Sequence, residues 1–210
     1  DAVRSDGSLY MGDNINLDFA IFDYIQRVDP IDTYVNVEGG ILELMYTGVS
    51  VEIAKPFLSG NLLLGASGTY VAKREPGSYY GIKEEVGRFK TGFLKSRIHF
   101  KKLDSYVDFK AGRFLAGDIG ISTKITKNIN GVLLSGWYTK TDTSVFSDPY
   151  NRVYSDVGIM VTVPFRLFRG RETKSTYAQS IRPWTRDVGS DVGGFTDIFD
   201  FIDVKKDKKD

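Results

Sequence analysis

The sequence contains no cysteine, which excludes disulfide bonds, thiolate metal sites and cysteine nucleophiles. It contains one histidine, His99, so a transition-metal centre built on imidazole and thiolate is not expected. Charge of neither sign dominates, because 28 Lys and Arg stand against 27 Asp and Glu. The net charge of +1 gives no field that would select nucleic acid as a partner. No apolar run approaches the ~20 residues of a transmembrane helix, although membrane-spanning β-strands need no such run.

Motifs for catalysis and cofactor binding are also missing. No glycine-rich phosphate loop follows a strand and opens a helix. His99 has no hydroxyl and carboxylate at a spacing that would make it a general base. We therefore predict no catalytic residue, no metal, no cofactor and no enzymatic activity. One alternative stays open, a β-sandwich enzyme acting on polysaccharide through loop carboxylates such as Glu84 and Glu85.

What the sequence has is glycine, aromatic residues and an alternation of apolar with polar residues. It contains 22 Gly, 14 Phe and 12 Tyr, and helical spacing is nearly absent. Such alternation, with Gly, Asn and Asp at the joints, predicts antiparallel strands linked in a meander. Asn130-Gly131 is the strongest hairpin signal, and Pro164 suits the end of a strand. About ten strands are predicted, near residues 15–21, 31–38, 41–54, 61–72, 94–101, 104–115, 118–127, 131–142, 157–163 and 175–184.

The predicted fold is all-β, an antiparallel meander of about ten long strands that forms an outer-membrane β-barrel or part of one. Most predicted strands are longer than the ~5–6 residues of globular proteins and approach the ~9–11 residues that cross a membrane. The predicted organisation is an N-terminal extension (1–14), the barrel segment (15–192) and a charged C-terminal tail (193–210), whose end, from Lys205 to Asp210, is expected to be solvated. A soluble sheet with an aromatic outer face remains the alternative.

A basic row lies on one face of the strand at 94–101. These side chains cannot face lipid, where Arg or Lys costs ~2–4 kcal/mol at the midplane, so they must face water. If the sheet is a barrel, the row lines its lumen and would attract anionic groups such as sugar acids or phosphates. Asp108 on the following strand could neutralise part of the row. The row consists of Lys95, Arg97, His99 and Lys101.

Four stretches match the pattern of one known family in order along the chain. They are GGILELMYTGVSVEIAKPF (39–57), AGRFLAGDIGISTKITKNINGVLLSGWYTKTDTS (111–144), DVGIMVTVPFRLF (156–168) and IRPWTRDVGSDV (181–192). Together they resemble the C-terminal part of the YjbH-like (also GfcD-like) family of outer-membrane β-barrel proteins of exopolysaccharide and capsule secretion. Relatives in this family are several times longer. The resemblance thus implies one segment of a larger barrel, or a short relative that completes a sheet with neighbouring chains.

The resemblance implies a location in the outer membrane of a Gram-negative bacterium and a non-enzymatic role in polysaccharide secretion or assembly. Its implied partners are periplasmic exopolysaccharide proteins or neighbouring barrel chains, the polysaccharide itself and outer-membrane lipid. A second hypothesis is a structural barrel subunit that anchors a large envelope machine, such as a motor or a secretion apparatus.

The matched motif residues are interpreted first as structural. Arg113 and Asp118 flank a glycine corner, where an ion pair or a carboxylate–backbone bond would fix the turn. Gly117 and Gly120 allow a positive φ or a bulge at this corner. Arg186 and Asp187 are given the same role at the last corner.

Overall fold

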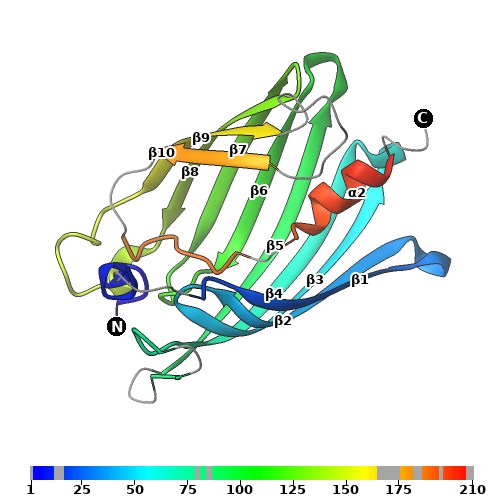
Figure 1. Cartoon of the computed structure of the whole chain (residues 1–210). Helices are drawn as coiled ribbons and strands as arrows, with labels where there is room; N and C mark the ends of the chain where they lie inside the picture. Colours follow the sequence, from blue (N-terminus) through cyan, green and yellow to red (C-terminus); the bar gives the residue numbers. More distant parts are fainter. Residues whose placement is uncertain are drawn as a thin grey trace.

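The computed structural model describes residues 2–11, 17–78, 81–83, 87–164, 176–181, 186–193 and 196–206. Ten antiparallel strands form one sheet, and each strand pairs with its neighbours in sequence, as Figure 1 shows. The predicted all-β meander is therefore confirmed. The strands are β1 (Ala20–Val28), β2 (Thr33–Glu43), β3 (Tyr46–Phe57), β4 (Leu62–Lys73), β5 (Arg88–Phe100), β6 (Ser105–Arg113), β7 (Ile119–Ile129), β8 (Val132–Thr141), β9 (Asp156–Pro164) and β10 (Thr176–Ile181).

Several predicted strands differ from the observed ones in their bounds; β5, for example, begins at Arg88, before the strand predicted at 94–101. The strand predicted at 15–21 begins only at Ala20 and continues to Val28, while residues 15 and 16 lie outside the described residues. The strand predicted at 41–54 contains the turn between β2 and β3, where Glu43 pairs with Tyr46. This turn consists of Leu44 and Met45, two apolar residues that give no turn signal in a sequence.

The hairpin signals are confirmed. Asn130 and Gly131 join β7 to β8 with φ values of 53° and 92°, the left-handed conformation that a two-residue hairpin requires. Gly117, in the corner between β6 and β7, has a φ of 95°. Pro164 is the last residue of β9, as predicted.

The two faces of the sheet differ in polarity. On the convex face, apolar residues stand in register from strand to strand, as where Val37 pairs with Tyr24 and with Val51. The alternate residues are mostly polar and face the concave side, where the C-terminal helix lies (Figure 1). Exposed apolar residues of the convex face include Phe22, Tyr24, Val37, Val49, Val51, Ile53, Leu94, Ile121, Ile125 and Ile159.

The sheet is open. Within the described residues β1 and β10 are its two edge strands, and neither pairs with the other. The structure thus corresponds to a curved wall, and a closed barrel is not observed.

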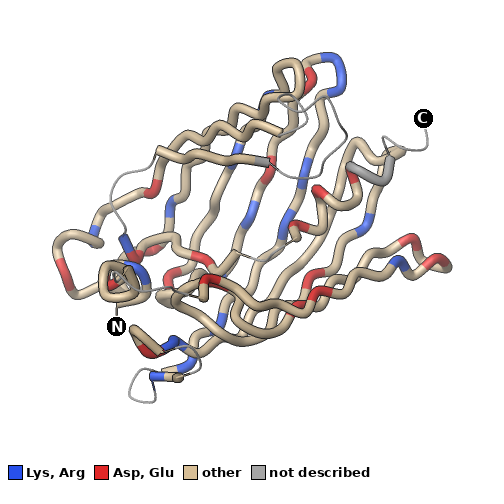
Figure 2. The backbone as a smooth tube through the Cα atoms, in the orientation of Figure 1, with Lys and Arg blue, Asp and Glu red and all other residues tan. Residues whose placement is uncertain are grey.

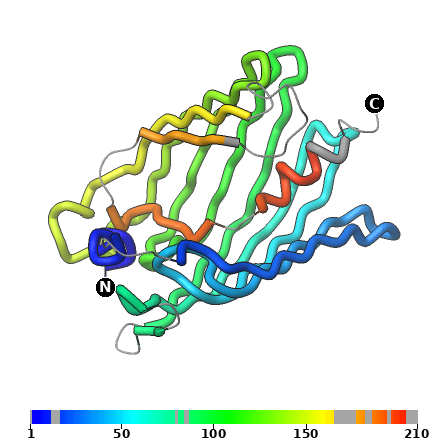
Figure 3. The backbone as a smooth tube through the Cα atoms, viewed as in Figure 1, coloured from blue at the N-terminus to red at the C-terminus, as the bar shows by residue number. Residues whose placement is uncertain are grey.

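Both terminal segments pack against this wall. Near the N-terminus, a 3-10 turn, η1 (Gly7–Tyr10), follows the buried residue Val3. Near the C-terminus, residues 186–193 and 196–206 follow the concave face from one end of the sheet to the other, ending in helix α2 (Ile198–Lys206), as Figure 3 shows. Among the described residues, no helix combines the length and the apolar character needed to cross a membrane.

The apolar cores therefore lie where these segments meet the sheet. One core joins Val3, Tyr10, Leu42, Met45, Tyr46, Val71, Leu115 and Val192, and the other joins Tyr34, Ala54, Leu63, Ile198, Phe199 and Ile202. The region predicted as a charged C-terminal tail (193–210) contains this helix, and its residues Ile198, Phe199 and Ile202 form an apolar helical face that is buried on the sheet. Residues 207–210 lie outside the described part of the chain.

Candidate functional site on the concave face

Hydroxyl groups line the concave face in cross-strand pairs. Ser50 and Thr69 are hydrogen-bonded at 3.1 Å between β3 and β4. Between β7 and β8, Ser122 and Thr139 are joined at 2.7 Å, and Thr126 and Ser135 at 3.0 Å. These pairs satisfy the polar groups of a face that would otherwise need water.

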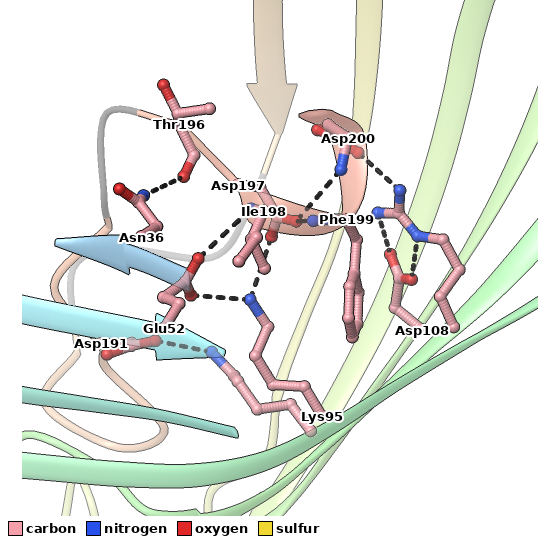
Figure 4. Close-up of polar contacts among 12 residues, drawn as sticks. Asn36, Glu52, Lys95, Asp108, Asp191, Thr196, Asp197, Ile198, Phe199 and Asp200 are labelled. Atoms are coloured by element: carbon pink, nitrogen blue, oxygen red, sulfur yellow. Dashed lines mark hydrogen bonds and ion pairs between the residues drawn. The ribbon is translucent and has the colours of Figure 1, made fainter. Parts of the chain in front are cut away.

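Lys95, on β5, connects the sheet to the C-terminal segment. Its Nζ donates to Glu52 Oε1 on β3 at 2.9 Å and to Asp197 Oδ2 at 3.2 Å, as Figure 4 shows. Desolvation alone would raise the pKa of the Asp197 carboxyl, but the charges of Lys95 and Arg97 outweigh it and lower that pKa to about 2. Asp197 is therefore ionised at neutral pH, and the ion pair is complete.

Arg97, two residues further along β5, binds three carboxylates. Its guanidinium bonds both oxygens of Asp108 on β6, at 2.6 and 3.0 Å. The same group contacts Asp200 at 2.6 Å and Asp203 at 2.9 Å on α2, and it lies 4.1 Å from the centre of the Tyr106 ring. Since the Arg97 side chain is only 4% exposed, this cluster is a buried ionic contact between the sheet and the helix.

Only three of the four residues in the predicted basic row lie on the same face of the sheet. Lys95, Arg97 and His99 share the concave face, and His99 Nε2 lies 3.2 Å from Asp203. Lys101 lies instead in the 3-10 turn η4 (Lys101–Leu103), where it is exposed. Figure 2 shows the Lys and Arg positions of the central strands beside the acidic positions of α2. Because carboxylates contact Lys95, Arg97 and His99, these three residues of the row do not present free positive charge to an anion.

Of these acidic partners, only Asp108, which Arg97 binds on the adjacent strand, is predicted from the sequence. Glu52, Asp197, Asp200 and Asp203 are separated from their partners by 43 to 106 residues. The run of aspartates spaced three apart at 197, 200 and 203 was the available signal, since this spacing places them on one side of a helix.

A polar cavity of about 380 Å³ lies between the sheet and the C-terminal segment. Lys110 crosses its wall to Asp191 at 2.8 Å, and Trp137 donates its indole N–H to Asp156 at 2.7 Å. The hydroxyl groups of the lining can donate hydrogen bonds to a polar ligand and can accept hydrogen bonds from it. The lining includes Ser67, Thr69, Lys110, Ser122, Lys124 and Trp137.

The matched motif residues attach the C-terminal segment to other parts of the chain. Asp118 does not pair with Arg113, which is exposed; its Oδ2 accepts the amide of Gly189 at 2.8 Å. Asp118 thus forms a carboxylate–backbone bond, but the donor of this bond belongs to the C-terminal segment and not to the corner itself. Leu115 in the same corner donates its amide to the Ser190 carbonyl at 2.9 Å.

The last motif behaves in the same way. Asp187 Oδ1 accepts the backbone amides of Val3, Arg4 and Ser5 at 3.0, 2.7 and 2.9 Å. Arg186 donates to the Tyr150 carbonyl and lies 4.3 Å from the centre of the Tyr154 ring. In the described residues, no group of three or more His, Cys, Asp or Glu side chains is arranged to hold a metal ion.

Fold and site define an all-β protein built as one open antiparallel meander, with an apolar convex face and a polar concave face covered by its own C-terminal segment. The chain belongs to the YjbH family, since the family model described as exopolysaccharide biosynthesis protein YbjH matches residues 1–204.

A curated relative is the uncharacterized lipoprotein YjbH of Escherichia coli (strain K12), which is 31% identical over 174 residues. The match covers 80% of this chain and 24% of the relative, so the chain spans about a quarter of the length of that protein. No solved structure matches the chain.

Proposed function

We propose that this chain forms part of the wall of an outer-membrane β-barrel that takes part in exopolysaccharide or capsule secretion and catalyses no reaction. The observation that carries the proposal is the division of one long-stranded sheet into an apolar convex face and a polar concave face. Alternation of lipid-facing and lumen-facing residues is what a transmembrane β-barrel requires.

Strand length supports the proposal. Strands β1 to β9 contain 9 to 13 residues each, and about 9–11 residues cross a bilayer when the strand is tilted. Large aliphatic and aromatic side chains are exposed on the convex face. A contiguous apolar surface of this kind marks an interaction with lipid or with another protein.

The comparisons support the process named in the proposal and a location in the envelope of a Gram-negative bacterium. The family description names exopolysaccharide biosynthesis, and the relative from a Gram-negative bacterium is named a lipoprotein. We therefore place the chain in the outer membrane, with periplasmic exopolysaccharide proteins or neighbouring barrel chains as partners. The hydroxyl-lined cavity beside Trp137 is where polysaccharide would contact the wall.

A second candidate is a barrel subunit that anchors a large envelope machine. It is favoured by one observation, the C-terminal segment that occupies the concave face through the ion pairs of Lys95 and Arg97. A wall covered on its inner side suits anchoring better than conduction. Pull-down with the tagged chain separates the two candidates, because exopolysaccharide proteins would indicate secretion and motor or secretion-ring proteins would indicate anchoring.

The test of the membrane-facing wall is the substitution Ile125→Lys. Ile125 lies in the middle of β7 on the convex face and is 57% exposed. If this face meets hydrocarbon, lysine costs ~2–4 kcal/mol, which lowers insertion into lipid vesicles by a factor of roughly 30 to 1,000. Insertion is measured by flotation with the vesicles and by heat-modifiable migration.

The matched control is Val153→Lys, at an apolar residue that is 95% exposed in the loop between β8 and β9. This variant should insert as the unmodified chain does. Insertion of Ile125→Lys at the unmodified level, or a monodisperse folded monomer in the absence of detergent, would contradict the proposal.

A further inference from the structure

Two carboxylates face each other where the C-terminal segment crosses the edge of the sheet. Asp23 on β1 and Glu38 on β2 are direct partners in the antiparallel register, and Asn36 precedes Glu38 by two residues on the same face. Thr196 lies against all three side chains. Its amide donates to Glu38 Oε1 at 3.0 Å, its hydroxyl to Asp23 Oδ2 at 2.9 Å, and its carbonyl accepts from Asn36 Nδ2 at 3.3 Å.

Each of these side chains keeps one buried oxygen without a hydrogen-bond donor. The oxygens are Asp23 Oδ1, Glu38 Oε2 and Asn36 Oδ1. Asn36 is 1% exposed and Glu38 is 2% exposed, so bulk water does not solvate their side chains. Buried acceptors are nearly always partnered, and an unpaired one is costly, most of all when it carries charge.

Positive charge is also missing at this place. Within the described chain, neither Asp23 nor Glu38 forms an ion pair with a Lys or an Arg. The ammonium of Lys95 is engaged by Glu52 and Asp197, which are themselves neighbours of the cluster, since Glu52 pairs with Asn36 and Asp197 follows Thr196. Like charges directly opposite on adjacent strands repel each other. In the described chain, no cationic side chain offsets this repulsion between Asp23 and Glu38.

We propose that Asp23, Glu38 and Asn36 bind a Ca²⁺ ion beneath Thr196. All the unpaired atoms are oxygens, which are the ligands that Ca²⁺ prefers, and no imidazole or thiolate is present to select zinc. Ca²⁺ accepts six to eight oxygens in flexible geometry and combines carboxylates with amide carbonyls and waters, whereas Mg²⁺ requires a near-ideal octahedron and is reluctant to lose water. Two carboxylates and one amide from two strands therefore suit Ca²⁺ better than Mg²⁺.

The site would fasten the C-terminal segment to the first two strands. Thr196 is hydrogen-bonded to both carboxylates and comes directly before Asp197, the partner of Lys95. A cation that fixes Asp23 and Glu38 therefore also fixes the acceptors that hold Thr196. This inference does not depend on the proposed role in the membrane, because it concerns the concave side of the sheet alone.

Calcium binding is tested on the full chain folded in detergent, freed of metal with a chelator and then titrated with CaCl₂ by calorimetry. We expect one binding site, and a midpoint of thermal unfolding that rises by roughly 5–10 °C at 100 times the dissociation constant. The amides of residues 196–203 should exchange hydrogen more slowly with Ca²⁺ than without it. No binding heat and no thermal shift in the unmodified chain would overturn the proposal.

Glu38→Gln removes the charge but keeps an oxygen that can accept the Thr196 amide, so Ca²⁺ affinity should fall at least tenfold. Asp23→Asn should do the same and serves if Glu38→Gln does not fold. The control is Asp29→Asn, at an exposed carboxylate whose side chain is 81% accessible. Equal affinity in Glu38→Gln and Asp29→Asn overturns the site.

A hydrogen-bonded arrangement of Asp23, Glu38 and Asn36 that involves no metal is the competing explanation. It would leave the unfolding midpoint unchanged on addition of Ca²⁺, which would overturn the proposal. Equal stabilisation by Mg²⁺ at the same concentration would overturn the assignment to calcium.

Discussion

At the scale of single residues, Arg97 is the main link between the sheet and α2. Its guanidinium is in contact with Asp108 on the sheet and with Asp200 and Asp203 on the helix. A buried cation with several acidic partners does not by itself add much stability, because each charge has lost its hydration. Removing the cation alone is different, since the carboxylates then remain without compensation.

We expect Arg97→Met to lower the free energy of unfolding by about 3 kcal/mol and to loosen α2. The value is at the low end for broken buried pairs because the Asp200 side chain is 62% exposed and regains water. Chemical denaturation measures the loss, and faster hydrogen exchange in 198–203 locates it. Arg27→Met is the matched control, since Arg27 pairs with Asp29 and Asp32 on an exposed hairpin, where a pair is worth about 0–1 kcal/mol. Equal losses in the two variants would contradict the assigned role.

Part of the site, the polar face of β5, can be predicted from the sequence, whereas most of its acidic partners cannot. Alternation along β5 places Lys95, Arg97 and His99 on one polar face, because the period of a strand depends only on neighbouring residues. The acidic partners of these residues come from β3 and from the C-terminal segment. Such long-range contacts depend on how the segment crosses the sheet, which no local pattern encodes.

At the scale of elements, the hairpins of β6, β7 and β8 depend on close contact between backbones. Gly120 has no unusual φ, but a Cβ atom at this position would lie 2.2 Å from the Lys140 carbonyl oxygen and 2.5 Å from the Thr141 Cα. The sequence analysis expected a positive φ or a bulge there. The observed requirement is instead the absence of a side chain where β7 approaches β8.

Gly120→Ala should therefore separate β7 from β8 locally and cost roughly 2–3 kcal/mol, as overpacking does elsewhere. The matched control is Gly136→Ala on β8, because a Cβ there meets its nearest atom, the Gly158 carbonyl oxygen, only at 3.9 Å. Unfolding midpoints in denaturant compare the two variants. A control that is as destabilised as Gly120→Ala would refute close approach as the reason for glycine.

Most strands were predictable from the sequence, and the failures have a physical cause. Asn130-Gly131 marks a turn because its residues adopt left-handed conformations that others avoid. Leu44-Met45 turns without such residues, so the predicted strand runs through it. The region of α2 is predicted as a charged tail because it leads into the run of Lys and Asp that ends the sequence. Its burial depends instead on where Ile198, Phe199 and Ile202 point, which composition does not show.

At the scale of the whole molecule, one carboxylate joins the two terminal segments. Asp187 in the C-terminal segment accepts three consecutive amides, from Val3 to Ser5, and also the Ser5 hydroxyl at 3.0 Å. The chain enters η1 shortly after Ser5. Tyr10 in that turn is buried in the same core as Tyr46. The described N-terminal residues, 2–11, are thus part of the folded wall.

Asp187→Ala should release the N-terminal segment and lower stability by about 3 kcal/mol, because several buried donors lose a charged acceptor. Limited proteolysis within residues 2–10 measures the release. Asp142→Ala is the control, since Asp142 accepts one amide, from Ser144, at an exposed turn, and its loss should cost about 1 kcal/mol without changing cleavage near the N-terminus. An intact N-terminal segment in Asp187→Ala would contradict this role.

The order of the strands has a consequence for how the molecule assembles. Because every strand pairs only with the strands before and after it, the sheet can grow by adding one hairpin at a time. The C-terminal segment binds side chains on β1, β2, β3, β5 and β6, so it can dock only once those strands are in place. Its docking would then be the last step of assembly, and its protection from proteases would report that the inner surface is complete.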